Sequence, residues 1–348
     1  MRERFRAAIQ FSRSPGRGAS GRGVPAASVN AASSLVLFAS IVAALTLSGT
    51  GTGPVEAAHA PSPGPGQIAL TKPSAVAAGV TIPPGPVAPP AAAIAPVSSV
   101  EPVVAPEPPA LSEAADPSST ARLHVPIFEY HRVKGWEGET GSARDLIVPP
   151  SLFAEQMDAM AAAGWHTITM GELGDDLRRG IQPPPKSFVV TLDDGYEDGY
   201  TNAFPVLRQH GFVATFFVIG DRIGNPNQLT VAEMQDLVAA GDEIGNHTLD
   251  HRDLKPMTPE MVVSEIYTTQ ALIATAVGVW PASFCYPKGL TNAAVTAIVA
   301  ATPGLVTAVI QAGSMPETWA NRLSLPRIRV GPGAYPQYLV DMADRFNQ

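Results

Sequence analysis

Short apolar runs alternate with amphipathic stretches from about residue 125 to the end of the chain. Runs rich in β-branched and aromatic residues predict strands at 125–130, 167–169, 188–192, 214–219, 243–246, 283–286, 306–309 and 327–330. Between them, apolar residues at helical spacing, with cap residues and terminal glycines, predict helices at 151–163, 172–179, 200–210, 231–240, 259–277, 292–300 and 336–346. This alternation predicts an α/β fold with a parallel sheet covered by helices, either a barrel or an open doubly wound sheet.

Two consecutive aspartates, Asp193 and Asp194, follow the predicted strand 188–192 and precede Gly195. Adjacent side chains on a strand point to opposite faces, so a strand interior would bury one carboxylate in apolar packing at high cost. The pair therefore belongs at the end of the strand, where Gly195 can turn the backbone and both carboxylates can face one pocket. A helix N-cap would account for one of these aspartates, but it does not need two.

A second group of polar residues, His247 and His251, follows the predicted strand 243–246. At this spacing two imidazoles can share one face of a helical turn and bind one metal ion. With Asp194 they make three protein ligands, which leaves a coordination position open, as in catalytic zinc sites. Chance spacing of two solvated histidines is the alternative, and the aspartate pair after a strand favours the metal site.

Five motifs then resemble the polysaccharide deacetylase family, also known as the NodB-homology domain or carbohydrate esterase family 4. The early Tyr-His motif is closest to the branch that contains the poly-N-acetylglucosamine deacetylases. The resemblance covers roughly the C-terminal two-thirds of the chain and implies a distorted (β/α) barrel of about seven strands. The five motifs are Val-Pro-Ile-Phe-Glu-Tyr-His-Arg-Val (125–133), Thr-Leu-Asp-Asp-Gly-Tyr (191–196), Ala-Thr-Phe-Phe-Val (214–218), Gly-Asn-His-Thr-Leu-Asp-His (245–251) and Phe-Cys-Tyr-Pro-Lys-Gly (284–289).

The resemblance also implies roles for the residues of these motifs. Asp194, His247 and His251 are expected to bind one divalent ion, with zinc as the expected metal. Asp193 is expected to be the general base that takes a proton from the attacking water. Tyr196 is expected to offer its backbone N–H to the oxyanion, while its ring serves either there or in simple packing.

Protonation of the departing amine requires a general acid, and here the chain departs from many relatives. Their late Leu-x-x-His-type motif is missing, because His251 is the last histidine of the chain. His131 ends the predicted strand 125–130, as in the branch with an early Tyr-His motif, and imidazole titrates near neutrality without large perturbation. We therefore predict that His131 is the acid; a histidine hydrogen-bonded within its own loop is the alternative.

The motif at 286–289 departs from the family pattern in two ways. The Arg-x-Pro of many relatives is replaced by Tyr286-Pro287-Lys288-Gly289, so Arg327 or Arg329 must orient Asp193 if any arginine does; both could equally be surface charges. Lys288 stands where relatives often carry an aromatic residue, which leaves the sugar subsite open. The chain's single cysteine, Cys285, lies in an apolar strand pattern and is predicted to be a buried thiol.

Composition divides the chain into three parts. Residues 1–60 form a basic leader with six arginines before residue 23 and an uncharged run at 35–47, which predicts a signal peptide or an uncleaved signal anchor. Residues 61–120 hold fifteen of the 35 prolines and predict a disordered, semi-rigid tether or a stretch without a role. Residues 121–348 are predicted to be the catalytic domain. Arginines before the apolar run place the remainder of the chain outside the cytoplasmic membrane, secreted or tethered.

The sequence therefore predicts a metal-dependent deacetylase that removes N- or O-acetyl groups from an envelope or extracellular polysaccharide. The alternative is a catalytically impaired carbohydrate-binding domain tethered to the cell envelope, which the missing late histidine favours. The formal net charge of −8 argues against nucleic acid as a partner, and no protein partner is indicated.

Overall fold

The computed structural model describes residues 106–107, 121–311 and 316–347. The predicted leader over 1–60 and almost all of the predicted tether over 61–120 lie outside the described residues, so their assignment stays a prediction. Within the described part of the chain, no helix combines the length and the apolar composition that crossing a membrane requires.

One curved sheet of nine parallel strands carries the fold in the described residues. Its strand order is β10-β9-β8-β7-β6-β5-β1-β11, and β4 pairs with β5 off this path. Because β10 and β11 stand at the two ends of this order and are consecutive in sequence, the sheet bends into a nearly closed barrel, and the predicted distorted (β/α) barrel is confirmed. The strands are β1 (Ile127–Tyr130), β4 (His166–Thr167), β5 (Ser187–Leu192), β6 (Thr215–Val218), β7 (Glu243–Asn246), β8 (Ser283–Cys285), β9 (Thr307–Ile310), β10 (Leu325–Pro326) and β11 (Ile328–Arg329), with a separate pair of β2 (Arg132–Val133) and β3 (Ile147–Val148).

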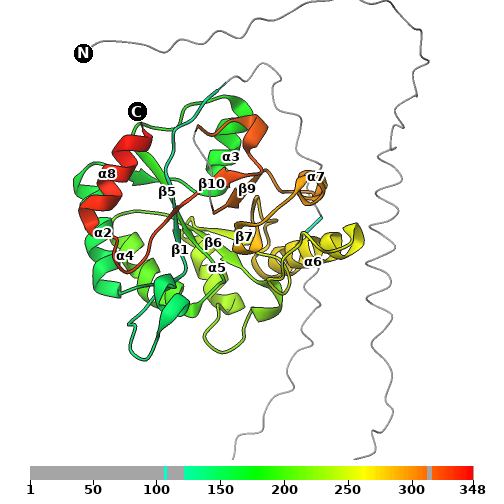
Figure 1. Cartoon of the computed structure of the whole chain (residues 1–348), viewed down its shortest axis with the longest axis horizontal. Helices are drawn as coiled ribbons and strands as arrows, with labels where there is room; N and C mark the ends of the chain where they lie inside the picture. Colours follow the sequence, from blue (N-terminus) through cyan, green and yellow to red (C-terminus); the bar gives the residue numbers. More distant parts are fainter. Residues whose placement is uncertain (1–105, 108–120, 312–315, 348) are drawn as a thin grey trace, which may run out of the picture. The chain divides into compact units, whose positions relative to one another are not determined.

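Helices cover the outside of this sheet. In Figure 1, α2, α4 and α8 lie on one flank, and α6 and α7 lie on the opposite flank. Their bounds agree with the sequence to within a few residues, because capping residues mark several of them: Thr258 caps α6 and Gly278 ends it in a left-handed conformation. The helices are α2 (Pro150–Ala162), α3 (Met170–Arg179), α4 (Phe204–Gln209), α5 (Val231–Ala239), α6 (Pro259–Val277), α7 (Ala293–Ala301) and α8 (Pro336–Phe346).

The predicted helix over 200–210 needs a correction. The structure has a π-helical turn over Gly199–Ala203, and only Phe204–Gln209 is α-helical. Pro205 explains the difference, because proline has no backbone N–H to continue an α-helical hydrogen-bond ladder from the preceding turn. Apolar periodicity alone does not show this break.

Strand side chains divide into an inner and an outer set. Outward residues of β1, β5, β6 and β7 pack against the covering helices, and Phe128, Phe188 and Phe216 belong to this buried cluster. Inward residues form a separate cluster with α3, so α3 lies against the inside of the barrel. Each fully buried apolar side chain of this kind contributes about 1.5–3 kcal/mol to folding. The inner cluster includes Ile127, Val189, Phe217, Cys285, Val309 and Leu325 from the strands, and Met170, Leu173 and Leu177 from α3.

Helix α3 closes the end of the barrel where the strands begin. The backbone N–H of Met170 donates to the Thr215 hydroxyl at the start of β6, at 3.0 Å. A side chain at Gly174 would lie 2.9 Å from Thr307 at the start of β9, so only glycine allows this close approach. The opposite end, where the strands terminate, remains open for a site.

Candidate active site

A pocket of about 300 Å³ lies at the carboxyl ends of the barrel strands. Because side chains alternate along each strand, residues that face the interior near the strand ends line it. The sequence placed motifs at these same ends, and the structure brings most of them together. The lining residues are Glu129, His131, Leu146, Asp193, Asp194, His247, His251, Tyr286, Lys288, Gly289, Gln311, Arg327 and Arg329.

Asp193 is held at the floor of this pocket by Arg327, the residue that precedes β11. The two guanidinium N–H groups donate to the two carboxylate oxygens, with distances of 2.7 Å and 2.8 Å. The same guanidinium lies 3.1 Å from Glu129, so it bridges two buried carboxylates. The side chain of Arg327 is only 2% exposed, which decides between the two sequence-based alternatives: this arginine orients Asp193 and is not a surface charge.

This arrangement fixes the charge of Asp193. Burial opposes its ionisation, but the Arg327 guanidinium holds the pKa of the carboxyl well below its usual range. The carboxylate is therefore ionised at neutral pH and can accept a proton. A carboxylate with a low pKa is a weak base, so its efficiency as a general base depends on its position relative to the proton that it accepts.

Asp194, His247 and His251 meet on the other side of the pocket floor. Nε2 of each histidine lies 3.5 Å from Asp194 Oδ1, and the two rings are 4.7 Å apart. Among the described residues, Asp194 Oδ1 is buried without a hydrogen-bond partner. One buried carboxylate oxygen and two imidazole nitrogens around a common point match the donors of a divalent-cation site, so these residues fit the predicted metal.

The pKa values of the two histidines determine how they could bind a cation. Burial, together with the neighbouring charge of His247, lowers the pKa of His251 to about 4, so this imidazole is neutral at physiological pH. Burial also opposes the charged form of His247, but Cys285 and Asp194 raise its pKa above the ordinary value. Nδ1 of His247 faces the Cys285 carbonyl at 2.7 Å, which leaves Nε2 toward Asp194. Cation binding here is therefore coupled to release of a proton.

The two histidines do not share a helical turn, contrary to the prediction. They lie in a loop after β7 in which Thr248 and His251 both have left-handed backbone conformations, with φ of 65°. The side chain of Asn246 accepts from the Thr248 N–H at 2.8 Å, and Glu265 of α6 accepts from the Leu249 N–H at 3.0 Å. Tertiary partners thus replace the helical hydrogen bonds that spacing alone suggested.

His131 lies directly after β1, across the pocket from the histidine pair. Its Nε2 is 3.9 Å from Asp193 Oδ2, and its Nδ1 is 3.9 Å from Glu129 Oε1. The ring is 13% exposed, so it is accessible from the pocket. The contact with Glu129, two residues before His131, is the local one, and the contact with Asp193 is the one that a catalytic role requires. Glu129, which the sequence analysis did not single out, completes the site.

Tyr196 does not line the pocket. Its ring lies under the Arg132 guanidinium, 4.1 Å from the ring centroid, and burial together with the nearby Asp194 raises the pKa of its hydroxyl. The proposed use of its backbone N–H stays a prediction. Two other described histidines are held elsewhere, since His166 bonds Ser187 at 2.9 Å and His210 pairs with Asp158 at 2.9 Å.

Comparison with known proteins identifies the chain. Residues 180–304 match the family model described as polysaccharide deacetylase. The chain is 31% identical over 222 residues to YxkH of Bacillus subtilis, named as a polysaccharide deacetylase, and this covers 63% of the chain and 77% of that relative. The chain belongs to the polysaccharide deacetylase family. It is therefore a hydrolase of the deacetylase class.

Solved deacetylases share the fold. The Streptococcus pyogenes deacetylase PplD, solved in complex with acetate, is 27% identical with a TM-score of 0.58, covering 62% of this chain and 96% of that one. IcaB from Ammonifex degensii is 24% identical with a TM-score of 0.56, covering 66% of this chain and 98% of that one, and this likeness shows the fold. The family resemblance stated from the five motifs is thus confirmed.

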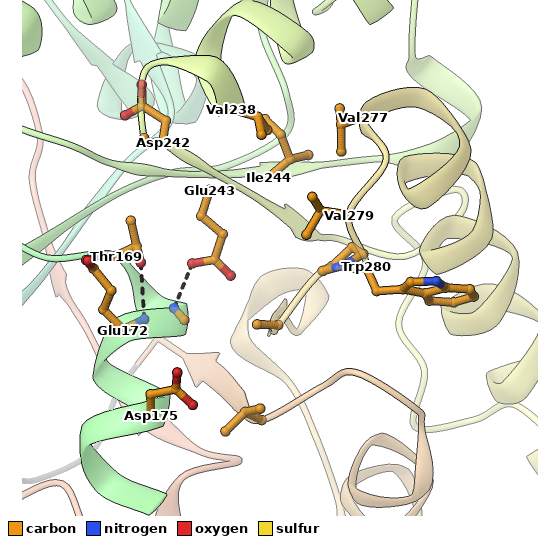
Figure 2. A pocket seen from close by; sticks show the side chains of 15 residues that line it. Thr169, Glu172, Asp175, Val238, Asp242, Glu243, Ile244, Val277, Val279 and Trp280 are labelled. Carbon is orange, nitrogen blue, oxygen red and sulfur yellow. Dashed lines mark hydrogen bonds between the residues drawn. The ribbon is translucent and has the colours of Figure 1, made fainter. Parts of the chain in front are cut away.

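This deacetylase has a second cavity at the opposite end of the barrel, of about 380 Å³, where the strands begin. Figure 2 shows Glu243 at the start of β7 pointing toward the first turn of α3, while Asp242 points to the other side of the strand. Glu243 accepts from the Gly171 N–H at 2.7 Å and from the Thr215 hydroxyl at 3.0 Å. These carboxyl groups anchor α3 and the strand starts, and they are not part of the active site.

Proposed function

We propose that this protein is a metal-dependent deacetylase that hydrolyses N- or O-acetyl groups on an envelope or extracellular polysaccharide. The observation that carries the proposal is the convergence of two sets on one pocket floor. Asp194, His247 and His251 offer the donors for a divalent cation, and Asp193 lies beside them as an ionised base. Zinc is the proposed ion, because it accepts two imidazoles and one carboxylate and leaves a position open.

The residues then divide the reaction between them. A divalent ion held here would polarise the acetyl carbonyl and lower the pKa of water. Asp193, fixed by Arg327, accepts the proton from the water that attacks the carbonyl carbon. His131, whose Nε2 lies 3.9 Å from Asp193 Oδ2, donates a proton to the departing sugar nitrogen or oxygen. The backbone N–H of Tyr196 is proposed to stabilise the negative oxygen of the tetrahedral intermediate.

A catalytically impaired binding domain is the second candidate, and the position of His131 argues against it. That alternative was drawn from the missing late histidine. The imidazole of His131, directly after β1, lies 3.9 Å from the proposed base, where a proton donor is needed. The pocket therefore offers a candidate for the general acid beside the proposed base and the proposed metal ligands.

Release of acetate tests the proposal. We would incubate the full chain with acetylated chitooligosaccharides and with acetylated xylan, after metal removal by a chelator and again after adding zinc. We expect acetate release from at least one substrate, lost on chelation and restored by zinc. Unchanged acetate release by the chelated protein would contradict metal dependence. Binding of the same glycans without any acetate release would support the alternative.

We also propose that the chain is exported, and that residues 61–120 tether the domain at the outer face of the cytoplasmic membrane or are secreted with it. The basic leader and the following apolar run support this. A variant that lacks residues 1–120 is expected to fold, to remain active and to stay in the cytoplasm. Export of that variant, or its failure to fold, would contradict the proposed boundary.

A further inference from the structure

The lining of the active-site pocket includes two cationic side chains that come from different strand ends. Lys288 follows β8, and Arg329 ends β11, and both line the pocket that holds Asp193 and the proposed metal ligands. These two cationic side chains belong to a chain whose formal net charge is −8. A neutral glycan needs no cation at its subsite, so the presence of these two cationic side chains requires another explanation.

Lys288 is built into the pocket lining by its backbone. It has a left-handed conformation, with φ of 59°, which costs a non-glycine residue about 1 kcal/mol or more. Hydrogen bonds close the turn on both sides: the Gly289 N–H donates to the Tyr286 carbonyl at 2.8 Å, and the Leu290 N–H donates to the Pro287 carbonyl at 3.1 Å. Gly289 lies so close to Gln311 that a Cβ would be 2.5 Å from its backbone nitrogen. The position of Lys288 is therefore fixed by the fold.

The charge of Lys288 has no counterpart within the part of the chain that the structure describes. Among the described residues, the ammonium group makes no ion pair or hydrogen bond, whereas Lys134 pairs with Glu139 at 2.8 Å. The residue is exposed at the mouth of the pocket. An unpaired cation whose backbone is held beside a binding site is available to an anionic ligand.

Arg329 is only partly neutralised. Its Nε lies 3.4 Å from Glu129 Oε1, but Glu129 also pairs with the fully buried Arg327 at 3.1 Å. The Arg329 side chain is 43% exposed, so the outer nitrogens of its guanidinium face the solvent side of the site. A planar guanidinium with free N–H groups suits a carboxylate or a phosphate.

We propose that the preferred substrate is an acidic glycan, in which the acetylated sugar or its neighbour carries a carboxylate or phosphate that Lys288 and Arg329 bind. This inference rests on the proposed function, since it names the substrate class of the same pocket. Lys288 and Arg329 act here as specificity residues and take no part in bond cleavage.

Equilibrium binding tests this without requiring turnover. Calorimetry would compare three oligosaccharides of equal length: neutral N-acetylglucosamine, alternating N-acetylglucosamine and glucuronic acid, and N-acetylglucosamine with a 6-phosphate. The wild-type full chain is expected to bind at least one anionic oligosaccharide about tenfold more tightly than the neutral one, since charge-assisted hydrogen bonds of this kind are each worth about a factor of ten or more. The difference should narrow in 0.5 M salt because exposed charges are screened. The two anionic arms show whether carboxylate or phosphate is preferred.

Matched variants locate the effect. Lys288→Gln and Arg329→Gln should each lower the anionic-to-neutral affinity ratio by about fivefold to tenfold, and Lys288→Arg should restore most of it. Lys186→Gln is the control, because Lys186 has the same left-handed backbone, with φ of 60°, and lies just before β5 at the other end of the barrel. Equal affinities in the wild type, or a ratio unchanged in Lys288→Gln, would overturn the inference. Acetate release measured in parallel separates the two proposals: selective binding without release contradicts only the proposed hydrolysis.

Discussion

The two ends of the barrel hold buried carboxyl groups in cavities of similar size, about 300 Å³ and about 380 Å³. The pKa values of these carboxyl groups shift in opposite directions at the two ends. At the carboxyl end, Asp193 and Asp194 both have pKa values lowered against the effect of burial, by Arg327 and by His247 respectively. At the amino end, burial raises the pKa of Asp242 to about 7 and also raises that of Glu243. One end keeps its carboxylates charged, and the other favours neutral acids.

The difference follows from the partners. Asp242 and Glu243 each accept a hydrogen bond from a backbone N–H group at one oxygen, while their other oxygens, Asp242 Oδ2 and Glu243 Oε1, are buried without a partner among the described residues, so burial outweighs these bonds and raises both pKa values. Asp193 pairs with a permanent cation, and Asp194 Oδ1 is directed at two imidazoles without a hydrogen bond of its own. A cavity with buried acids is therefore not by itself an active site. The cations around the acids distinguish the two.

Loss of His247 should have the largest effect. His247→Ala removes one of three proposed metal ligands, so metal content and acetate release should fall together, with activity reduced by about a thousandfold or more. Elemental analysis of the purified protein and an acetate assay measure both. His166→Ala, which removes an imidazole near the amino end of the barrel, is the control and should keep both. Full metal occupancy in His247→Ala would refute the ligand assignment.

Loss of His131 should separate chemistry from metal binding. His131→Ala should retain the metal and lose roughly two to four orders of magnitude in turnover, the usual contribution of a general acid. The measurement is kcat beside metal content, with His124→Ala as a control from the segment before β1. Turnover near the wild-type value would mean that another group or bulk water supplies the proton.

Loss of Arg327 should damage both stability and activity. Arg327→Met leaves Glu129 and Asp193 buried without their shared cation, so the free energy of unfolding should fall by about 3–5 kcal/mol at pH 7. Arg329→Met is the matched control, since Arg329 contacts the same Glu129 from a half-exposed position and should cost less than about 1 kcal/mol. Urea unfolding measures both. Equal losses in the two variants would show that burial of the pair is unimportant.

The free energy of unfolding should depend on pH through Asp242, at the amino end of the barrel. The pKa of Asp242 is about 7 in the fold against an ordinary 3.8, so between these values the folded protein holds a proton that the unfolded chain has lost. Stability should therefore fall as pH rises from about 4 to 7, by up to about 4 kcal/mol from this group. Asp242→Asn cannot ionise and should lack this part of the slope. Urea midpoints of the wild type and of Asp242→Asn, measured at pH 5 and pH 8, test this. The same change of midpoint with pH in both proteins would contradict a neutral Asp242.

The sequence by itself determined the α/β alternation, the family and most of the residues at the site. Apolar runs predicted the strands of the sheet to within a few residues, except β10 (Leu325–Pro326), which they missed. Polar residues just past the strands lie close together, because parallel strands end at the same face. Asp193, Asp194, His131 and His247 each follow a strand, and all four line one pocket. The position of a polar residue directly after an apolar strand run is visible in the sequence without any knowledge of distant residues.

Only the tertiary structure decided which distant residues complete that site. Arg327 is 134 residues from Asp193, and nothing in the sequence distinguished it from Arg329 until burial did. The loop of His247 and His251 takes its shape from Glu265 on α6, so histidine spacing alone wrongly suggested a helical turn. Charge pairing, loop conformation and the ionisation of buried acids depend on neighbours far along the chain, and the fold alone brings those neighbours into contact.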